Sequence, residues 1–223
     1  MLWQPAHPPP TELPHQTPDQ LARAEGFRRI AGMDEAGRGP WAGPVVAAAV
    51  ILRETRFAVR IDDSKRLTPM QRAAAYHAIM ARAEVGIGIV SADDIDRHNI
   101  LQATLRAMTA AIRDLSTEPD LILVDGPMAP PLTIPCWPVV HGDQRSRAIA
   151  CASIVAKTVR DGLMAFYHEL YPGYQFCRHK GYGTSLHARA LDALGPCLLH
   201  RRSFRPVAAA QTWRHGLEVA ASI

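Results

Sequence analysis

One stretch, residues 30–40, constrains the fold of this chain more than any other. A short apolar run ends there in two adjacent acids, Asp34 and Glu35, and the glycine turn Gly37-Arg38-Gly39 follows at once. A second apolar run covers residues 45–52, so the pattern predicts two antiparallel strands joined by the turn. Such an arrangement places carboxylates at the end of a sheet beside exposed backbone N–H groups. That environment suits a divalent cation and a phosphate.

The rest of the chain alternates apolar strands with segments of helical periodicity. In chain order we expect a helix over 69–83, a strand over 85–90, a helix over 100–115 and a buried strand over 121–124. A proline-broken stretch over 130–138 then leads to a brief edge strand, followed by a long helix over 147–170 and a helix over 186–194. The resulting order, β-β-α-β-α-β-β-α-α, predicts an α/β fold in which helices flank a mixed five-stranded sheet.

Composition sets limits on the class of protein. With 223 residues the chain suits one sizeable domain, and a net charge of +4 permits nucleic acid as a partner without establishing it. No apolar run approaches the roughly 18 residues that a membrane span needs, so we expect no membrane association. The four cysteines form no Cys-x-x-Cys pair and indicate free buried thiols in a reducing compartment, the cytoplasm.

The two ends of the chain differ from its middle. Residues 1–27 are rich in proline and lack the basic and apolar regions of a signal peptide, so we expect a disordered extension. Residues 28–210 are expected to form one catalytic domain. Residues 211–223 form a tail in which we find no clear sliding-clamp-binding motif, so a clamp partner is left open.

Two more acids end or follow apolar elements. Asp125 ends the buried strand, and Asp143 lies just before the long helix. Strand-end acids tend to collect at one rim of an α/β sheet. Four carboxylates gathered there repel by on the order of 4 kcal/mol for each pair at ~4 Å, so cations must neutralise them. Hard oxygen donors select Mg²⁺ or Mn²⁺, and two ions roughly 4 Å apart form the clamp used for phosphodiester hydrolysis.

Simpler interpretations exist for the single residues. Asp125 in Asp-Gly-Pro is also a turn former, and Asp143 also suits a helix cap. The glycine turn lacks Gly-Lys-Ser/Thr and opens no helix, which disfavours a dinucleotide or P-loop site. The residues alone therefore favour a metal-dependent hydrolase or phosphotransferase among several alternatives.

Six ordered blocks resemble bacterial ribonuclease HII across about residues 30–207. The blocks are Met33 to Val50 around the glycine turn, Asp63-Ser64-Lys65-Arg66-Leu67, Val124-Asp125-Gly126, Gly142-Asp143 through Lys157 to Asp161, Lys180-Gly181-Tyr182-Gly183-Thr184 with His187, and His200 to Pro206. The resemblance implies an RNase H-like fold and a monomeric endoribonuclease. The Pro-rich N-terminus lies outside the resemblance, and we expect it to be too short for the extra N-terminal domain of the sibling class, ribonuclease HIII, which favours HII.

The resemblance also implies substrates, cofactors and a mechanism. The enzyme would hydrolyse RNA in RNA–DNA hybrids and cut 5′ of ribonucleotides embedded in duplex DNA, with roles in ribonucleotide and primer removal. Asp34, Glu35, Asp125 and Asp143 would hold two Mg²⁺ or Mn²⁺ ions. One ion would activate a water and the other would stabilise the leaving 3′-oxygen, which leaves 3′-hydroxyl and 5′-phosphate ends.

Substrate-binding residues are carried over by the same resemblance. Gly37, Arg38 and Gly39 would read the 2′-hydroxyl, and Tyr182 would sense the neighbouring sugar. Ser64, Lys65, Ser153 and Lys157 are candidates for phosphate contacts. Arg201-Arg202 is expected to be a solvated pair by default, with a contact to the duplex as the alternative. Two rival functions stay open: a non-catalytic hybrid-binding module, and an RNase H-like nuclease that acts on plain DNA.

Overall fold

The computed structural model describes residues 16–210, which divide into two compact units. The first comprises residues 16–36, 46–89 and 104–158, and the second comprises residues 37–45, 90–103 and 159–210. The predicted boundary at residue 28 falls inside the first unit. The predicted tail over residues 211–223 lies outside the described residues.

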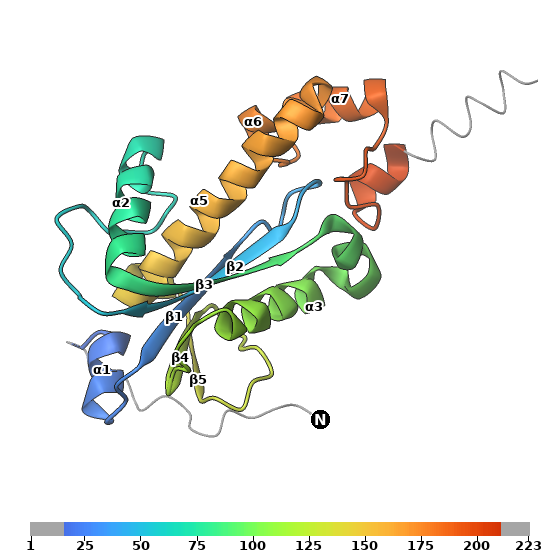
Figure 1. Ribbon diagram of the computed structural model, residues 1–223. Helices are drawn as coiled ribbons and strands as arrows, with labels where there is room; N and C mark the ends of the chain where they lie inside the picture. Colours follow the sequence, from blue (N-terminus) through green and yellow to red (C-terminus); the bar gives the residue numbers. More distant parts are fainter. Residues whose placement is uncertain (1–15, 211–223) are drawn as a thin grey trace, which may run out of the picture. The chain divides into compact units, whose positions relative to one another are not determined.

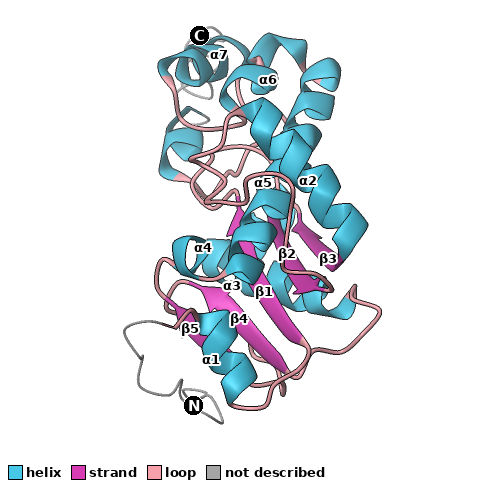
Figure 2. Cartoon of the chain, turned by 90° about the vertical axis from the view of Figure 1, so that its left-hand side faces the viewer, coloured by secondary structure: helices cyan, strands magenta, loops and turns pink. Residues whose placement is uncertain are grey.

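The first unit carries a five-stranded sheet in the order β3-β2-β1-β4-β5 (Figures 1 and 2). Strand β1 is antiparallel to β2 and parallel to β4, and β4 is parallel to β5. The strands are β1 (Ile30–Ala36), β2 (Val45–Leu52), β3 (Ala83–Val90), β4 (Leu121–Asp125) and β5 (Cys136–Val139). The predicted mixed sheet is therefore confirmed. Its shortest strand, β5, contains Pro138 at the sheet edge, where a missing N–H is tolerated.

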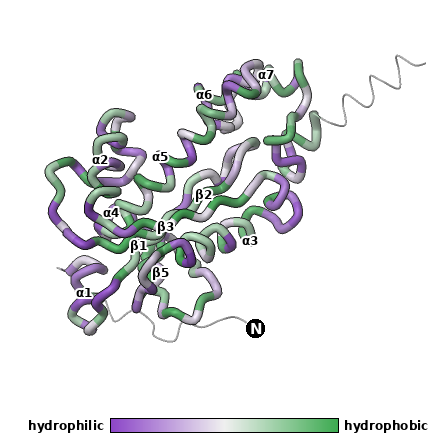
Figure 3. The backbone as a smooth tube through the Cα atoms, viewed as in Figure 1, coloured by the Kyte–Doolittle hydropathy of each residue, from purple (hydrophilic) through white to green (hydrophobic). Residues whose placement is uncertain are grey.

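Apolar strands and close helix contacts hold the sheet in place. Figure 3 shows hydrophobic residues along much of β1 and β2, and the residues from Val45 to Val50 are fully buried. Helix α5 (Arg147–Leu170) begins against β1, because a Cβ on Gly32 would come within 2.1 Å of the Ala148 carbonyl carbon. Only glycine permits that approach. The first half of β1 is thereby fixed relative to the start of α5.

The helices follow the sequence periodicity, with one difference. Helices α2 (Pro69–Arg82), α5 and α7 (Ser185–Leu194) match their predicted positions, and Thr68 caps α2 through a capping box. Helix α3 (Ala92–Arg113) begins earlier than predicted. Asn99 breaks it with φ 65°, so the helical period does not continue across that residue. Short elements complete the list: α4 (Gly142–Arg145), η1 (Pro172–Tyr174) and α6 (Phe176–His179).

Part of the predicted N-terminal extension is ordered, which corrects the expectation of disorder for residues 18–24. Helix α1 (Pro18–Ala24) starts with Thr17 in a capping box, and Ala22 is fully buried in the apolar cluster of the sheet. The Asp19 carboxylate accepts hydrogen bonds from the N–H groups of Arg147 and Ala148, both at 3.1 Å. Residues 1–15 lie outside the described residues.

Two further sequence expectations concern cysteines and membranes. All four cysteines are free thiols, as predicted, but only Cys136 and Cys151 are buried, whereas Cys177 and Cys197 are half-buried. Burial raises the pKa of both Cys136 and Cys151 to about 12. Among the helices within residues 16–210, none combines the length and the apolar character needed to cross a bilayer.

Candidate active site

The sheet brings two of the predicted acids side by side in the first unit. Strands β1 and β4 are parallel, and Met33 pairs with Val124. The next residues along the two strands are Asp34 and Asp125, so both carboxylates leave the sheet at the same rim. Glu35 follows Asp34 near the end of β1 and is half-buried. Parallel pairing therefore explains why two acids far apart in the sequence become neighbours.

Asp143 joins this rim through a backbone contact of the preceding residue. The N–H of Gly142 donates to Oδ1 of Asp125 at 2.7 Å, which places the start of helix α4 against the end of β4. Ser146 Oγ accepts from the N–H of Ile149 at 3.2 Å. The capping role that the sequence also allowed for Asp143 thus belongs to Ser146, and the Asp143 side chain is 6 % exposed.

Electrostatic repulsion connects the four acids. Burial raises the pKa of Asp34 well above its usual value, the charges of Glu35 and Asp125 raise it further, and a hydrogen bond from the Ser153 hydroxyl opposes the shift. Burial likewise raises the pKa of Asp143, with further contributions from the charges of Asp63 and Asp125. Each of these acids therefore lies close enough to another for their negative charges to repel. A cation bound among them would relieve this repulsion.

Lys65 supplies positive charge at the same rim. Its Nζ lies 3.9 Å from Oδ2 of Asp143, and its side chain is largely exposed. Partial burial alone would lower the pKa of Lys65, but the charges of Asp63, Asp143, Asp34 and Asp125 raise it overall. The ammonium group therefore lies in the field of the whole acidic cluster.

The two serines predicted to contact phosphates lie inside the protein. Ser64 and Ser153 are 3 % and 4 % exposed, and their hydroxyl oxygens are 3.0 Å apart. Because the Ser153 hydroxyl also bonds Asp34, this pair links the loop at residue 64 to the first of the predicted catalytic acids. Lys157 lies one helical turn after Ser153 on α5 and is half-buried.

Asp63 is a fifth acid that sequence reasoning passed over as a site residue. It is 6 % exposed, its Oδ1 accepts the N–H of Lys65 at 2.9 Å, and its charge raises the pKa of Asp143. The sequence offered a signal, since Asp63 opens the block that resembles the family. It ends no apolar strand, however, so the argument from strand ends could not find it.

The oxygen donors of these acids suit a hard divalent cation, but the carboxylates are not yet spaced to bind one. Carboxylate oxygens are the donors that Mg²⁺ and Mn²⁺ prefer, and the repulsion described above would fall when an ion binds. Within residues 16–210, no three His, Cys, Asp or Glu side chains converge closely enough to hold a metal ion as they stand. Binding therefore requires the carboxylates to turn towards a shared ion.

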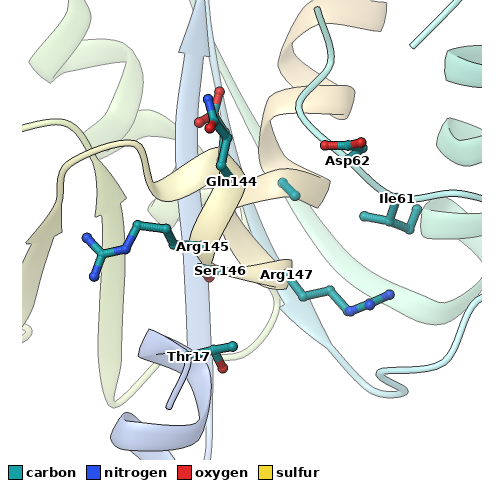
Figure 4. A pocket seen from close by; sticks show the side chains of 9 residues that line it. Thr17, Ile61, Asp62, Gln144, Arg145, Ser146 and Arg147 are labelled. Carbon is teal, nitrogen blue, oxygen red and sulfur yellow. The ribbon is translucent and has the colours of Figure 1, made fainter. Parts of the chain in front are cut away.

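A small pocket adjoins Asp143 on the side of α4 and α1 (Figure 4). Arg145 and Arg147 extend in opposite directions from this region (Figure 4). The other polar residues of the lining are Thr17, Asp62, Gln144 and Ser146. The pocket is thus polar and of mixed charge beside one of the predicted catalytic acids.

The glycine turn belongs to the second unit, where a buried arginine holds it. Arg201 has no exposed surface and donates from Nη2 to the Gly37 carbonyl at 2.6 Å and from Nη1 to the Arg38 carbonyl at 2.9 Å. It also binds the Gly43 carbonyl through Nε and Nη2. The expectation that Arg201-Arg202 is a solvated pair is therefore wrong for Arg201, whereas Arg202 is exposed.

A second buried arginine binds the same segment to the loop that carries Tyr182. Arg160 donates to the carbonyls of Pro44 at 2.9 Å, Ala42 at 3.2 Å and Lys180 at 3.0 Å. Its guanidinium carbon also lies 5.9 Å from the centroid of the Tyr182 ring. Tyr182 itself is 43 % exposed, as a residue that contacts substrate must be.

Buried histidines hold the backbone of that loop. The N–H of Cys197 donates to Nδ1 of His200 at 3.0 Å, so the His200 proton resides on Nε2, which faces His187 Nε2 at 3.0 Å. His187 accepts there and donates through Nδ1 to the Tyr182 carbonyl at 3.0 Å. This pattern needs two neutral rings. Burial accordingly lowers the pKa of His187 to about 4 and that of His200 to about 3.

Comparison with known proteins identifies the family. The family model described as ribonuclease HII matches residues 31–207. The ribonuclease HII of Chlamydia muridarum (strain MoPn / Nigg) is 52% identical over 191 residues, which cover 85% of this chain and 88% of the relative.

Solved structures show the same fold at low sequence identity. The ribonuclease H2 from Pyrococcus horikoshii OT3 superposes with a TM-score of 0.71 at 22% identity, covering 83% of this chain and 98% of the other. The RNase HII of Archaeoglobus fulgidus, in a PCNA:RNase HII complex, gives a TM-score of 0.68 at 21% identity and coverages of 80% and 96%. Bst-RNase HIII in complex with Mn²⁺ gives 0.64 at 19% identity, with coverages of 91% and 76%.

These matches agree with the mixed sheet and its flanking helices. The family model extends from β1 to the segment after Arg201, so it includes every site residue named above. The chain therefore belongs to the ribonuclease HII family and is a ribonuclease H, a hydrolase that acts on the RNA of RNA–DNA hybrids.

Proposed function

We propose that this ribonuclease H also cuts on the 5′ side of ribonucleotides embedded in duplex DNA, through a two-metal mechanism that leaves 3′-hydroxyl and 5′-phosphate ends. One observation carries the proposal: the parallel pairing of β1 and β4 sets Asp34 beside Asp125, and the Gly142 hydrogen bond adds Asp143 to them. The raised pKa values of Asp34 and Asp143 support a shared cation as the missing partner.

The proposed roles follow from the chemistry of each group. Asp34, Glu35, Asp125 and Asp143 hold the cations, and the Ser153 hydroxyl orients Asp34. Two Mg²⁺ or Mn²⁺ ions bound there would supply an activated water and would neutralise charge at the leaving oxygen. The Mn²⁺ complex of Bst-RNase HIII supports this choice of ion.

Two further groups of residues are proposed to contact the substrate. Lys65 and Lys157 contact phosphates of the duplex, whereas Ser64 and Ser153 act through the buried pair described above. Gly37, Arg38 and Gly39 follow Asp34 and Glu35 after a single intervening residue, and their backbone groups read the 2′-hydroxyl.

Tyr182 completes the proposed substrate contacts. Its exposed ring stacks on the sugar next to the RNA–DNA junction, and its backbone is held by His187. An aromatic ring on a short, fixed loop can sense sugar shape at low entropic cost.

Assembly and location are proposed as well. We infer a monomer in the cytoplasm, supported by the four free thiols. A sliding clamp stays an open partner: the Archaeoglobus fulgidus neighbour is described in a complex with PCNA. Residues 211–223, where the sequence shows no clear clamp motif, lie outside the described residues.

Three duplexes test the proposal: an RNA–DNA hybrid, a DNA duplex with one ribonucleotide, and the all-DNA duplex of the same sequence. Each is incubated with Mg²⁺, Mn²⁺ or EDTA, and the product ends are identified by ligation and by 5′-phosphate labelling. We expect metal-dependent cleavage 5′ of the ribonucleotide and none of the all-DNA duplex. Binding without cleavage would favour a hybrid-binding module, and equal cleavage of all-DNA would favour a general DNA nuclease.

A further inference from the structure

The second unit contains two fully embedded cations that contact backbone carbonyls. Arg160 is 1 % exposed and Arg201 has no exposed surface. Both guanidinium groups donate to backbone carbonyl oxygens. Arg160 donates to Pro44, Ala42 and Lys180. Arg201 donates to Gly37, Arg38 and Gly43, which all belong to residues 37–43. The burial of two positive charges against one short segment needs a physical explanation.

Burying a guanidinium group is unfavourable unless its hydrogen bonds are fully used. The effective penalty for an ion in a protein interior is several kcal/mol. Burial, together with the neighbouring charge of Arg160, indeed lowers the pKa of Arg201 to about 9. An apolar side chain would fill the same volume without this cost, so packing alone does not account for the arginine.

Arg201 determines which way two peptide groups of the turn face. In a planar trans peptide the C=O of one residue and the N–H of the next point in opposite directions. Because the carbonyls of Gly37 and Arg38 both point at Arg201, the N–H groups of Arg38 and Gly39 point away from it. Arg38 and Gly39 are exposed, so these two donors face the outside of the turn.

The conformation of Gly37 makes the orientation of its peptide groups depend on the surrounding contacts. Gly37 has φ 101°, a left-handed conformation that costs a residue with a side chain energy, and a Cβ there would meet Nε of Arg160 at 2.1 Å. A glycine-rich segment is otherwise free to rotate its peptide planes. Two hydrogen bonds from the planar guanidinium of Arg201 remove that freedom for the carbonyls of Gly37 and Arg38, and its bonds to the Gly43 carbonyl hold the guanidinium itself in place.

We propose that Arg201 is a positioning residue that makes the turn Gly37-Arg38-Gly39 selective for ribose, by presenting the N–H groups of Arg38 and Gly39 as a fixed pair of donors. The chemical class that such donors take is an acceptor oxygen on the sugar, and a 2′-deoxyribose offers none at that place. The inference rests on the proposed function, since it assigns a cause to the reading of the 2′-hydroxyl by this turn. Arg160 assists by holding the same segment to the carbonyl of Lys180.

The chain offers a matched control one residue away. Arg202 is exposed, whereas Arg201 is buried, so Arg201→Lys and Arg202→Lys make the same chemical change in two different environments. Lysine keeps the charge but cannot donate in one plane to three carbonyls. Any effect of general charge or of duplex attraction should appear in both variants, and loss of peptide orientation should appear only in Arg201→Lys.

The measurement is the ratio of dissociation constants for the all-DNA duplex and the duplex with one ribonucleotide, taken by fluorescence anisotropy in EDTA. Both duplexes are titrated with the same preparation, so an inactive fraction cancels from the ratio. We expect Arg201→Lys to reduce the preference for the ribonucleotide by about tenfold, the equivalent of about 1.4 kcal/mol, while its affinity for all-DNA stays within about twofold. Arg202→Lys should keep the wild-type ratio.

The outcomes separate the inference from the function on which it rests. A wild-type protein with no preference for the ribonucleotide would overturn the proposed function. A wild-type preference that Arg201→Lys retains would overturn the role of Arg201 alone. If Arg201→Lys does not fold by circular dichroism, Arg160→Lys is measured instead, because it loosens the same segment through Ala42 and Pro44. An unchanged ratio in that folded variant also counts against the inference.

Discussion

The N–H of Gly142 donates to Oδ1 of Asp125 across 2.7 Å, and this contact sets the loop that carries Asp143 against the end of β4. A Cβ on Gly142 would lie 2.6 Å from Cδ1 of Ile149 and 3.2 Å from that same Asp125 oxygen. The acidic cluster thus depends on a residue with no side chain. The positions of the carboxylates at the rim therefore depend on backbone geometry as well as on the acids themselves.

Gly142→Ala should therefore separate Asp143 from Asp125. We expect cleavage of the single-ribonucleotide duplex to fall by at least about tenfold, with a loss of about 1–3 kcal/mol in the free energy of unfolding from overpacking. The control is Gly162→Ala, in helix α5, where a new Cβ has no atom within 4 Å. That variant should keep activity and gain roughly 0.5–1 kcal/mol of stability. Unchanged cleavage in Gly142→Ala would show that the contact is dispensable.

Lys65→Met should change metal and duplex binding in opposite directions. Its ammonium lies 3.9 Å from Asp143, so its removal leaves the acids more negative and should tighten Mn²⁺ binding a few-fold in calorimetric titrations. Affinity for the duplex should weaken because a phosphate contact is lost. Arg66→Met is the control, since Arg66 pairs with Asp62. Two changes of the same sign in Lys65→Met would contradict this assignment.

Replacement of Tyr182 should distinguish its ring from its hydroxyl. Tyr182→Phe keeps stacking on the sugar and removes one hydrogen bond, so its loss of kcat/KM should be smaller than that of Tyr182→Ala. About 1–3 kcal/mol is the usual value of an aromatic stacking contact. Equal losses in the two variants would assign the function to the hydroxyl group.

The neutral His187–His200 pair predicts a loss of stability in acid. Both pKa values are lowered in the folded state, to about 4 and about 3, so the unfolded chain takes up more protons once the pH falls below about 6.5. The stabilisation is complete above that pH and is lost as the pH falls towards the folded values. Between pH 7.5 and 5 each imidazole should contribute a loss on the order of 2 kcal/mol.

Urea unfolding of the wild type, His200→Gln and His77→Gln at the two pH values tests this pair. Asp34 acts in the opposite direction, because its raised pKa makes its contribution to stability improve as the pH falls. The quantity to compare is therefore the loss of unfolding free energy on acidification in each variant relative to the loss in the wild type. His200→Gln should lose less stability on acidification than the wild type, and the exposed His77 should make no difference. Equal losses in all three proteins would place the titration elsewhere.

Much of the fold could be predicted because its signals are local. Continuous apolar runs mark β1, β2 and β4, and a Thr-Pro start marks α2. The positions of Asp34 and Asp125 followed from the ends of those strands. The first part of α3 was not predicted, because Asn99 has a positive φ and interrupts the helical period.

The remaining site residues depend on contacts that no local pattern shows. Arg201 stands in a His-Arg-Arg run that is typical of a solvated surface, and only the fold buries it against carbonyls from residues 37–43. Asp63 lies in a loop and ends no strand. Helix α1 lies in proline-rich sequence, which does not predict a helix. It is held in place because the Asp19 carboxylate accepts the N–H of Arg147 at the start of α5.

The central claim is that acids from β1, β4 and α4 form one cation site for phosphodiester hydrolysis. Single-turnover cleavage and duplex affinity of Asp34→Asn, beside Asp62→Asn as a control outside the cluster, test it most directly. We predict that Asp34→Asn lowers the cleavage rate by about a thousandfold, or ~4 kcal/mol, and changes duplex affinity by less than about threefold. Asp62→Asn should cleave normally. Normal cleavage by Asp34→Asn, or equal losses in both variants, would contradict the account.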